Sequence, residues 1–300
     1  MYVSDILKDS EGTRFSLEVY PPKAAGSPDD LPIQKHLSAI FDTVEHLIRY
    51  DPAFISVTYN PTGSTRTTSI PIAAIIKQRY GVESVAHLTC IATPRAEIAR
   101  TLDVLEYFGI ENILALRGDR PEGSECPPDS LEYASDLVSE IRAHDHDFCI
   151  GVAGYPEGHP ECLTSENKKD MTADLQFFQN KITGGASFAI SQLFLENPVY
   201  FDFITRAQSA GIEIPILPGI MPITDMDTIG IVTGLIGATI PVHLMQKFEG
   251  AKDDPAEIIE IGIDHAIHQC KGLMDKVPCI HFYTMDKWEP VHRIIESLIH

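Results

Sequence analysis

The sequence has few cationic residues. Its 300 residues include 23 lysines and arginines against 43 aspartates and glutamates, which gives a formal net charge of −20. A field of this sign repels nucleic acid and anionic membrane surfaces, so we expect neither as a partner. A small anionic ligand remains compatible with this charge, because a few local donors can hold one phosphate or carboxylate.

The sequence also lacks long apolar runs and paired cysteines. No stretch approaches the ~20 apolar residues of a membrane span, and no basic segment leads into an apolar run at the N-terminus. We therefore expect a cytoplasmic protein. The six cysteines are scattered without a C-x-x-C pair, which argues against a disulfide framework and against a cysteine-based zinc site.

Short strand-like runs alternate with longer helical patterns along the whole chain, and this alternation is typical of parallel α/β architecture. Apolar residues at three- and four-residue spacing, such as Ile98, Leu102 and Leu105, mark the helices. The eight strand candidates are residues 14–20, 53–58, 84–90, 112–116, 148–152, 188–192, 214–217 and 279–283. No G-x-G-x-x-G follows a strand, so we predict a (β/α)₈ TIM barrel, a single catalytic domain over residues 1–300, rather than an open nucleotide-binding sheet.

The residues at or just beyond the ends of these strands are mostly polar, and barrel enzymes place their sites there. They are Glu18, Thr58, Tyr59, His87, Thr89, Arg117, Gly118, Asp119, Tyr155, His159, Gln192, Gly219 and Tyr283. Glu18 lies inside an apolar strand, and burial is expected to raise its pKa, which suits a general acid. The alternative is a structural glutamate that pairs with a basic residue such as Arg117.

The other strand-end residues also allow two interpretations each. Gly118, between Arg117 and Asp119, permits close approach of the backbone to a planar ligand, but the segment could equally be a turn with a local salt bridge. His87 stands in an apolar run, where a lone histidine is more often part of the core. Gln192 offers an amide to a heterocycle, or it simply ends its strand.

Two histidine-containing segments suggest metal ligands, and we predict no metal site at either. Residues 144–147 read His-Asp-His-Asp but lie between a helix and a strand, on the rim opposite the expected site. In the second segment, His159, Glu161 and Cys162 surround Pro160, which stiffens the loop, and no further ligand group is near in sequence.

Nine segments, in order, resemble those of the methylenetetrahydrofolate reductase family. They are FSLEVYPPK at 15–23, FISVTY at 54–59, HLTC at 87–90, ALRGD at 115–119, YASDL at 133–137, GYPEGHPE at 154–161, SQLF at 191–194, PGIMP at 218–222 and HFYT at 281–284. The resemblance spans nearly the whole chain, and the ordered set is far more specific than any single motif.

The resemblance implies a barrel that carries non-covalent FAD over its strand ends and reduces 5,10-methylenetetrahydrofolate to 5-methyltetrahydrofolate, a step of one-carbon metabolism that leads to methionine. NADH or NADPH is the expected electron donor. Glu18 would protonate the folate N10 and help to open its imidazolidine ring, and reduced flavin would deliver hydride from N5. Asp119 would tune the charge beside flavin and folate.

The resemblance also implies the binding residues. Gln192 would contact the pterin amide, and Tyr283 and Lys287 would complete the substrate site. The residues that would hold FAD are Thr58, His87, Arg117, Gly118, Asp119, Tyr133, Ala134, Tyr155, His159, Asp174 and Lys181.

Four positions depart from the family pattern. Phe177 and Asn180 stand where bacterial relatives tend to have a polar residue and an arginine, so a contact to the FAD diphosphate is expected to be missing. Met226 replaces an aromatic residue that often packs on substrate or nicotinamide, and Lys287 replaces an arginine. These changes bear on FAD affinity and on the identity of the donor.

Three functional hypotheses follow. The first is the NAD(P)H-dependent reductase. The second is a catalytic subunit of the same fold that takes electrons from ferredoxin or a partner flavoprotein, or that acts on tetrahydromethanopterin. The third is a non-catalytic flavin- or folate-binding regulator, which the joint presence of Glu18, Asp119 and Gln192 argues against. The long C-terminal extension of the eukaryotic enzymes is not seen, so we expect no regulatory domain. Residues 229–240 could be a homo-oligomer interface or face the core.

Overall fold

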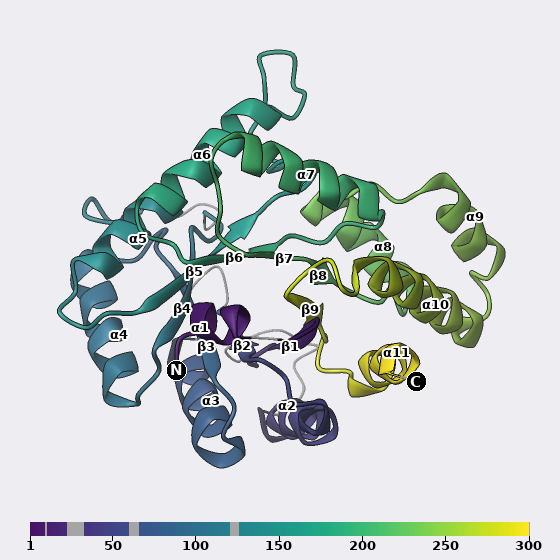
Figure 1. Ribbon diagram of the computed structural model, residues 1–300, viewed down its shortest axis with the longest axis horizontal. Helices are drawn as coiled ribbons and strands as arrows, with labels where there is room; N and C mark the ends of the chain where they lie inside the picture. Colours follow the sequence, from purple (N-terminus) through teal and green to yellow (C-terminus); the bar gives the residue numbers. More distant parts are fainter. Residues whose placement is uncertain (10, 23–32, 60–65, 121–125, 300) are drawn as a thin grey trace.

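The computed structural model describes residues 1–9, 11–22, 33–59, 66–120 and 126–299 (Figure 1). Within these residues, nine parallel strands form one sheet in the order β7-β6-β5-β4-β3-β2-β1-β9-β8. The strands are β1 Arg14–Val19, β2 Ile55–Val57, β3 Ser84–Thr89, β4 Asn112–Leu116, β5 Cys149–Gly154, β6 Phe188–Ser191, β7 Ile216–Leu217, β8 Gly219–Ile220 and β9 Cys279–Tyr283.

The sheet closes into a barrel through β7 and β8, which are two halves of one strand interrupted at Pro218. Proline has no N–H to donate to a neighbouring strand, so the ladder breaks at this residue. The two halves face different neighbours, since β7 pairs with β6 and β8 pairs with β9. The Pro218 carbonyl still accepts a hydrogen bond of 2.9 Å from the His281 N–H. The predicted (β/α)₈ TIM barrel is confirmed, and its seventh strand runs further than the predicted 214–217.

Helices surround the barrel, as Figure 1 shows. They are α1 Val3–Lys8, α2 Ile33–Leu47, α3 Arg66–Tyr80, α4 Arg95–Tyr107, α5 Ala134–Arg142, α6 Met171–Thr183, α7 Asn197–Ser209, α8 Met226–Gly230, α9 Val242–Gly250, α10 Pro255–Leu273 and α11 Trp288–Ile299, with the 3₁₀ helix η1 Ile48–Tyr50 and the π-helix η2 Ile231–Ile236. No helix among the described residues combines the length and the apolar character that crossing a membrane requires.

The apolar core has two main parts, one outside and one inside the barrel. Outside, residues such as Ile98 and Leu102 of α4 are fully buried against the strands, as their helical spacing predicts. Inside, Val3 of α1 packs with Phe54 and Phe188, and its N–H donates to Asn112 Oδ1 at 2.8 Å. Helix α1 therefore covers the N-terminal end of the barrel, which leaves the C-terminal strand ends for polar groups.

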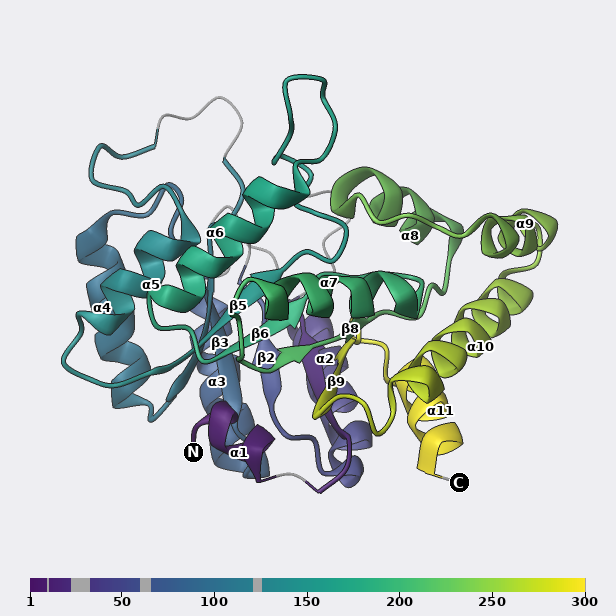
Figure 2. The ribbon, with the colours of Figure 1, turned by 45° about the horizontal axis from the view of Figure 1, so that its top comes forward.

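The apolar segment 229–240 mainly faces the protein interior. Ile229, Val232 and Ala238 are buried in a third apolar cluster, together with Met221 and Ile223 from the segment after β8. Helix α8 lies beside the C-terminal side of the barrel in Figure 2, with α9 beyond it. The core interpretation of this segment therefore accounts for most of its apolar residues.

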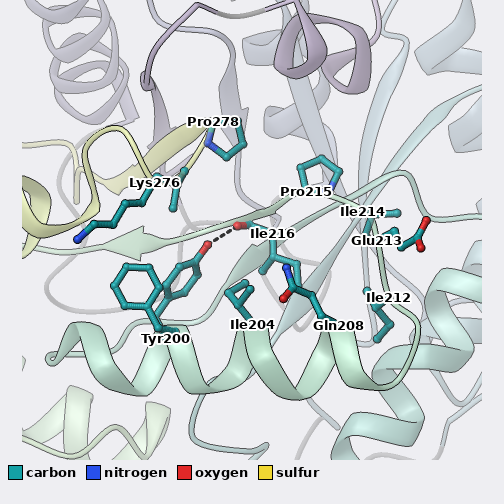
Figure 3. A pocket seen from close by; sticks show the side chains of 12 residues that line it. Tyr200, Ile204, Gln208, Ile212, Glu213, Ile214, Pro215, Ile216, Lys276 and Pro278 are labelled. Atoms are coloured by element: carbon teal, nitrogen blue, oxygen red, sulfur yellow. Dashed lines mark hydrogen bonds between the residues drawn. The ribbon is translucent and has the colours of Figure 1, made fainter.

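A cavity of about 200 Å³ lies between α7 and the N-terminal ends of β7 and β9 (Figure 3). Tyr200 closes one side of it, and its hydroxyl donates to the Ile216 carbonyl at 2.6 Å. The lining includes Pro215 and Pro278, which precede these strands. The cavity is therefore at the opposite end of the barrel from the polar strand ends, and we assign it no role in the chemistry.

Gly262 allows α10 to approach the segment after β8 very closely. A Cβ at this residue would lie 1.8 Å from the Ile223 carbonyl oxygen, a backbone atom that cannot simply rotate away. We expect Gly262→Ala to lower the free energy of unfolding by about 1–3 kcal/mol, the usual cost of overpacking. Gly250→Ala is the control, because a Cβ there meets nothing within 4 Å. Urea unfolding of both variants checks this, and equal stabilities would contradict it.

Candidate active site

Glu18 lies at the centre of the polar groups in the barrel and is only 5% exposed. The inward faces of four strands meet around its carboxylate. Ser56 of β2 donates its hydroxyl to Oε2 at 3.2 Å, and His281 Nε2 of β9 lies 3.4 Å from the same oxygen. His87 Nε2 of β3 is also 3.4 Å from Oε2. Glu18 therefore lies between two imidazole rings.

His281 connects Glu18 to a second buried hydroxyl. Its Nδ1 lies 2.9 Å from Ser16 Oγ, which also accepts a hydrogen bond of 3.3 Å from Cys279 Sγ. Because an ionised carboxylate can only accept, His281 carries its proton on Nε2, and its Nδ1 accepts from Ser16. The arrangement is a continuous chain of hydrogen-bonding groups from Ser16 through His281 to Glu18.

The pKa of Glu18 is lower than its ordinary value, which contradicts the expectation from the sequence. Burial by itself raises the pKa of this carboxyl, as predicted, but its interaction with His87, the hydrogen bond from His281 and a further bond from Tyr20 outweigh the effect of burial. The alternative partner is also wrong, because Arg117 pairs with Glu161 at 2.6 Å. Glu18 is therefore a carboxylate at neutral pH.

Two buried polar atoms on β3 have no hydrogen-bond partner within the described part of the chain. They are His87 Nε2, which lies near Glu18 but out of alignment for a bond, and Thr89 Oγ1. Alternate residues of a strand point to the same face, so both side chains face the barrel interior. Burial lowers the pKa of His87 to about 4, which leaves it neutral at pH 7. Such atoms normally have a partner, and these are available to a bound ligand.

A second group of charged residues gathers above β4 and β5. Arg117, Asp119, Glu161 and Lys181 all act electrostatically on His159, whose pKa is lowered mainly by burial and then by Arg117. This coupling shows that residues far apart in sequence lie close together in the folded protein.

Lys181 and Tyr155 form the inner part of this group. Lys181 donates to the Ala153 carbonyl at 2.6 Å and lies 6.0 Å from the centre of the Tyr155 ring. Burial lowers the pKa of Lys181 to about 8, although the nearby Asp174 opposes the shift. Burial, followed by the charge of Asp174, raises the pKa of Tyr155 to about 12. Lys181 therefore offers a cation at the strand ends.

The turn at Gly118 has the geometry that its glycine suggests. Gly118 has a φ of 83°, in the left-handed region, and its carbonyl accepts a hydrogen bond of 3.1 Å from Arg117 Nε. The Arg117 carbonyl accepts from the N–H of Ile91 at 2.8 Å. These bonds tie the end of β4 to the segment after β3. Arg117 therefore has both an ion pair and a local hydrogen bond. The alternative of a turn with a salt bridge is correct in that Arg117 forms a salt bridge, but its partner is Glu161 and not Asp119.

The three predicted substrate-binding residues lie on the side of β6 to β9. Gln192 Oε1 accepts from the Leu193 N–H at 2.8 Å, and the Tyr283 hydroxyl donates to the Ser191 carbonyl at 2.8 Å. Lys287 Nζ is 3.2 Å from Thr224 Oγ1 and 3.4 Å from Asp225 Oδ2. Tyr283 interacts electrostatically with Glu18, whereas Lys287 belongs to the outer rim beside α8.

Thr58 and the start of α5 complete the predicted positions. The Thr58 N–H donates to the Val19 carbonyl at 3.0 Å, which places Thr58 beside the end of β1. Tyr133 and Ala134 begin α5, and the Tyr133 carbonyl accepts from the buried Cys90 thiol at 3.5 Å. The predicted residues therefore surround one end of the barrel, some in its interior and some on its rim.

Sequence reasoning did not identify several residues of this site. Ser56 and His281 face Glu18 from neighbouring strands, and Ser16 of β1 contacts His281. Strand alternation could have pointed to His281, two residues before Tyr283. Asp286 accepts from the Tyr20 N–H at 3.0 Å, and burial raises its pKa to about 7. Asp286 follows β9 with a φ of 54°, so only the folded loop brings it to the site.

The two histidine-containing segments have ordinary partners. His144 lies 3.1 Å from Asp103 at the N-terminal end of the barrel, away from the strand ends. His159 Nδ1 accepts from the Glu161 N–H at 3.1 Å. Across the ranges that the structure describes, no group of three histidine, cysteine, aspartate or glutamate residues is arranged to hold a metal ion.

Comparison with known proteins agrees with the strand-end pattern. The profile of the methylenetetrahydrofolate reductase family matches residues 3–299. Methylenetetrahydrofolate reductase 2 of Schizosaccharomyces pombe is 36% identical over 295 residues, which cover 94% of this chain and 45% of the relative. 5,10-Methylenetetrahydrofolate reductase of Escherichia coli is 35% identical over 287 residues, which cover 94% of this chain and 90% of the relative. The chain thus spans about half the length of the eukaryotic relatives it matches.

A solved structure shares the fold. An uncharacterised protein from Clostridium thermocellum that binds two copies of 5-methyl-5,6,7,8-tetrahydrofolic acid superimposes with a TM-score of 0.63, covering 98% of this chain and 96% of that one. The two sequences are 13% identical, so this likeness supports the barrel and nothing further.

Proposed function

The chain belongs to the methylenetetrahydrofolate reductase family, and on this premise we propose that it reduces 5,10-methylenetetrahydrofolate to 5-methyltetrahydrofolate in a flavin-dependent reaction. The observation that carries the proposal is Glu18, a buried carboxylate held between His281 and His87 at the C-terminal end of the barrel. We further propose that residues 1–300 act as one catalytic domain, that the setting is cytoplasmic, and that NADH or NADPH is the electron donor.

The residues present fit FAD. His87 Nε2 and Thr89 Oγ1 are buried polar atoms that need partners, and a flavin ring has donors and acceptors along its edge. Lys181 and Arg117 supply cations that suit a diphosphate. The side chains that would hold the cofactor are Thr58, His87, Arg117, Gly118, Asp119, Tyr133, Ala134, Tyr155, His159, Asp174 and Lys181. When bound, flavin supplies the hydride chemistry that no side chain of the protein can perform.

The protein itself manages the proton. Glu18 Oε2 is the proposed site that takes up a proton and passes it to the folate nitrogen as the five-membered ring opens. His281 Nε2 contacts this oxygen and is backed by Ser16, so the chain can hold the carboxyl in one orientation and exchange a proton with it. Because its pKa is lowered, Glu18 is mostly ionised at neutral pH. The protonated form is then a minor species, but it is a stronger acid and has a larger driving force to transfer its proton to the folate nitrogen.

The remaining polar residues bind and orient the substrate. We propose that Gln192 offers its amide NH₂ to the pterin, because its oxygen already accepts from the Leu193 N–H and the residue lines a small hollow together with Tyr155. Tyr283 lies near enough to Glu18 to interact with its charge, and Lys287 at the rim suits the carboxylates of the glutamate tail. Asp119 lies with Arg117 and Lys181, where its negative charge balances two cations as flavin and folate bind.

The first test is the visible spectrum of the purified protein, with FAD added if none copurifies. We expect the absorption band of oxidised flavin, which bleaches when NADH or NADPH is added without oxygen and returns when 5,10-methylenetetrahydrofolate follows. Flavin that neither nucleotide reduces, but that ferredoxin or a partner flavoprotein does, would assign the donor to another protein. The proposal would be overturned if the protein binds no flavin, or if 5,10-methylenetetrahydrofolate does not reoxidise its reduced flavin.

A further inference from the structure

Two exposed aromatic rings face each other between α5 and α6. Tyr133, at the start of α5, is 48% exposed, and Phe177, in the middle of α6, is 51% exposed. Their ring centres are 6.3 Å apart and their planes are inclined by only 11°. Large aromatic side chains normally bury most of their surface, so a nearly parallel pair that keeps half of its surface open is unusual in the resting protein.

The backbone fixes both rings independently of each other. The Tyr133 N–H donates to Asp136 Oδ2 at 3.0 Å, and the Tyr133 carbonyl accepts from the Asp136 N–H, so the first turn of α5 sets the position of this ring. On α6, the adjacent Phe178 is 2% exposed and lies 5.4 Å from Phe203, which fixes the rotation of the helix. Phe177 is therefore held outward by the core contact of its neighbour.

The surroundings of the pair indicate what kind of ligand it suits. Gln176 and Asn180 beside Phe177 are exposed and bind each other at 3.2 Å, so they do not cover the ring. Lys181 is four residues from Phe177 on the same side of α6. The charges of Lys181 and Arg117 both lower the pKa of His159. An open aromatic surface on the same side of α6 as the cation of Lys181 matches a planar base joined to phosphates.

We propose that Tyr133 and Phe177 form the stacking site for the adenine ring of FAD, an inference that rests on the proposed function. Phe177 then has a positive role, since the stacked contact compensates for the polar and arginine contacts that residues 177 and 180 do not provide. Stacking tolerates any planar base, but it requires that the base be present. The pair therefore distinguishes FAD from FMN, which has the same flavin ring and one phosphate but no adenine.

The experiment compares the binding of FAD and of FMN to flavin-free protein by equilibrium dialysis, without any turnover. We expect wild type to bind FAD more tightly than FMN. Phe177→Ala should weaken FAD binding roughly tenfold, the loss of one base–aromatic contact, and leave FMN binding unchanged. Phe177→Trp should keep the preference. The matched control is Tyr107→Ala, because Tyr107 is 86% exposed and also has an aromatic neighbour, Phe108, but lies at the far end of α4.

The outcomes separate this inference from the proposed function. If neither FAD nor FMN binds wild type, the proposed function fails. If both bind and Phe177→Ala changes neither, the adenine contact is elsewhere, and the aromatic pair belongs to a protein interface or to helix packing. If the variant weakens FAD and FMN equally, the pair only supports the site, and the inference is overturned while the flavin proposal stands.

Discussion

Under the proposed function, replacing Glu18 by glutamine is expected to slow the oxidation of reduced flavin by 5,10-methylenetetrahydrofolate by about 10²–10⁴-fold, the usual contribution of a general acid. Reduction of the flavin by its donor should stay nearly unchanged, because hydride transfer from a nicotinamide needs no proton from Glu18. Glutamine has almost the same shape and keeps an oxygen that can accept from Ser56 and His281, so the fold around it should persist.

Anaerobic stopped-flow measurement of the two half-reactions tests this expectation. The matched control is Ser56→Ala, which removes the 3.2 Å hydrogen bond to Glu18 but leaves the acid in place, and which should slow the folate half-reaction far less. A loss of equal size in both half-reactions would show that Glu18 supports the flavin site and does not act as the acid.

The same experiment has a pH signature. Because the pKa of Glu18 is lowered, its protonated fraction is small at neutral pH and grows as the pH falls. The folate half-reaction of the wild type should therefore accelerate on acidification across the neutral range, and that of Glu18→Gln should not. A wild-type rate that falls with acid would contradict a lowered pKa for Glu18 as the proposed acid.

The sequence allowed the barrel to be predicted because each strand and helix carries its own periodicity. Buried strands such as Asn112–Leu116 and Cys279–Tyr283 were located to the residue, since a short apolar run between polar turns has few alternatives. The seventh strand was cut short at Leu217 because Pro218 removes a donor. That the chain resumes as β8 depends on pairing with β9, a contact that local patterns do not contain.

The sequence allowed the positions of these strand-end residues to be predicted, but not their electrostatics. Glu18 was identified because a carboxylate in an apolar strand is conspicuous, yet its pKa moves in the opposite direction from the one expected. Burial follows from the local sequence, whereas the identity of the groups across the barrel depends on strand register. His87 and His281 are 69 and 263 residues from Glu18 in the chain, and only the closed sheet makes them its neighbours.

The sequence alone also does not show which side chains surround a departure from the family pattern. Phe177 reads as the loss of a polar contact when it is compared position by position. In the folded protein it faces Tyr133, which the sequence places 44 residues earlier, and the two rings make a surface that neither makes alone. The relevant comparison is therefore between arrangements of side chains, and a substitution that removes one interaction can create another.

The stability of the protein in acid should change in opposite directions when two titrating residues are replaced. Burial lowers the pKa of His265 to about 4, although the Leu195 carbonyl at 2.9 Å opposes the shift, and nearby His243, His268 and Lys247 lower it further. The unfolded state, with a histidine pKa near 6.5, then binds the proton first. This contribution is fully present above about pH 6.5 and is lost as the pH falls toward about 4.

Asp286 changes the pH dependence of the unfolding free energy in the opposite direction from His265. Burial raises its pKa to about 7, the charge of Glu18 adds to the shift, and the Tyr20 N–H opposes it. The folded state therefore binds this proton before the unfolded state does. Asp286 contributes stability below about pH 4, where both states are protonated, and that contribution is lost as the pH rises toward about 7. Asp286 Oδ2, the oxygen that does not accept from Tyr20, lies 3.6 Å from His36 Nε2.

The expected result concerns how much stability each variant loses between pH 7 and pH 5. Relative to wild type, His265→Gln should lose roughly 2 kcal/mol less, and Asp286→Asn roughly 2 kcal/mol more, since each group changes the slope by at most ~1.4 kcal/mol per pH unit. Both substitutions keep the existing hydrogen bonds, because glutamine can donate to the Leu195 carbonyl and asparagine can accept from the Tyr20 N–H. Urea unfolding of the three proteins at each pH measures the slopes directly. Changes of the same sign in both variants would mean that general loosening of the fold, rather than proton linkage at these two residues, controls stability in acid.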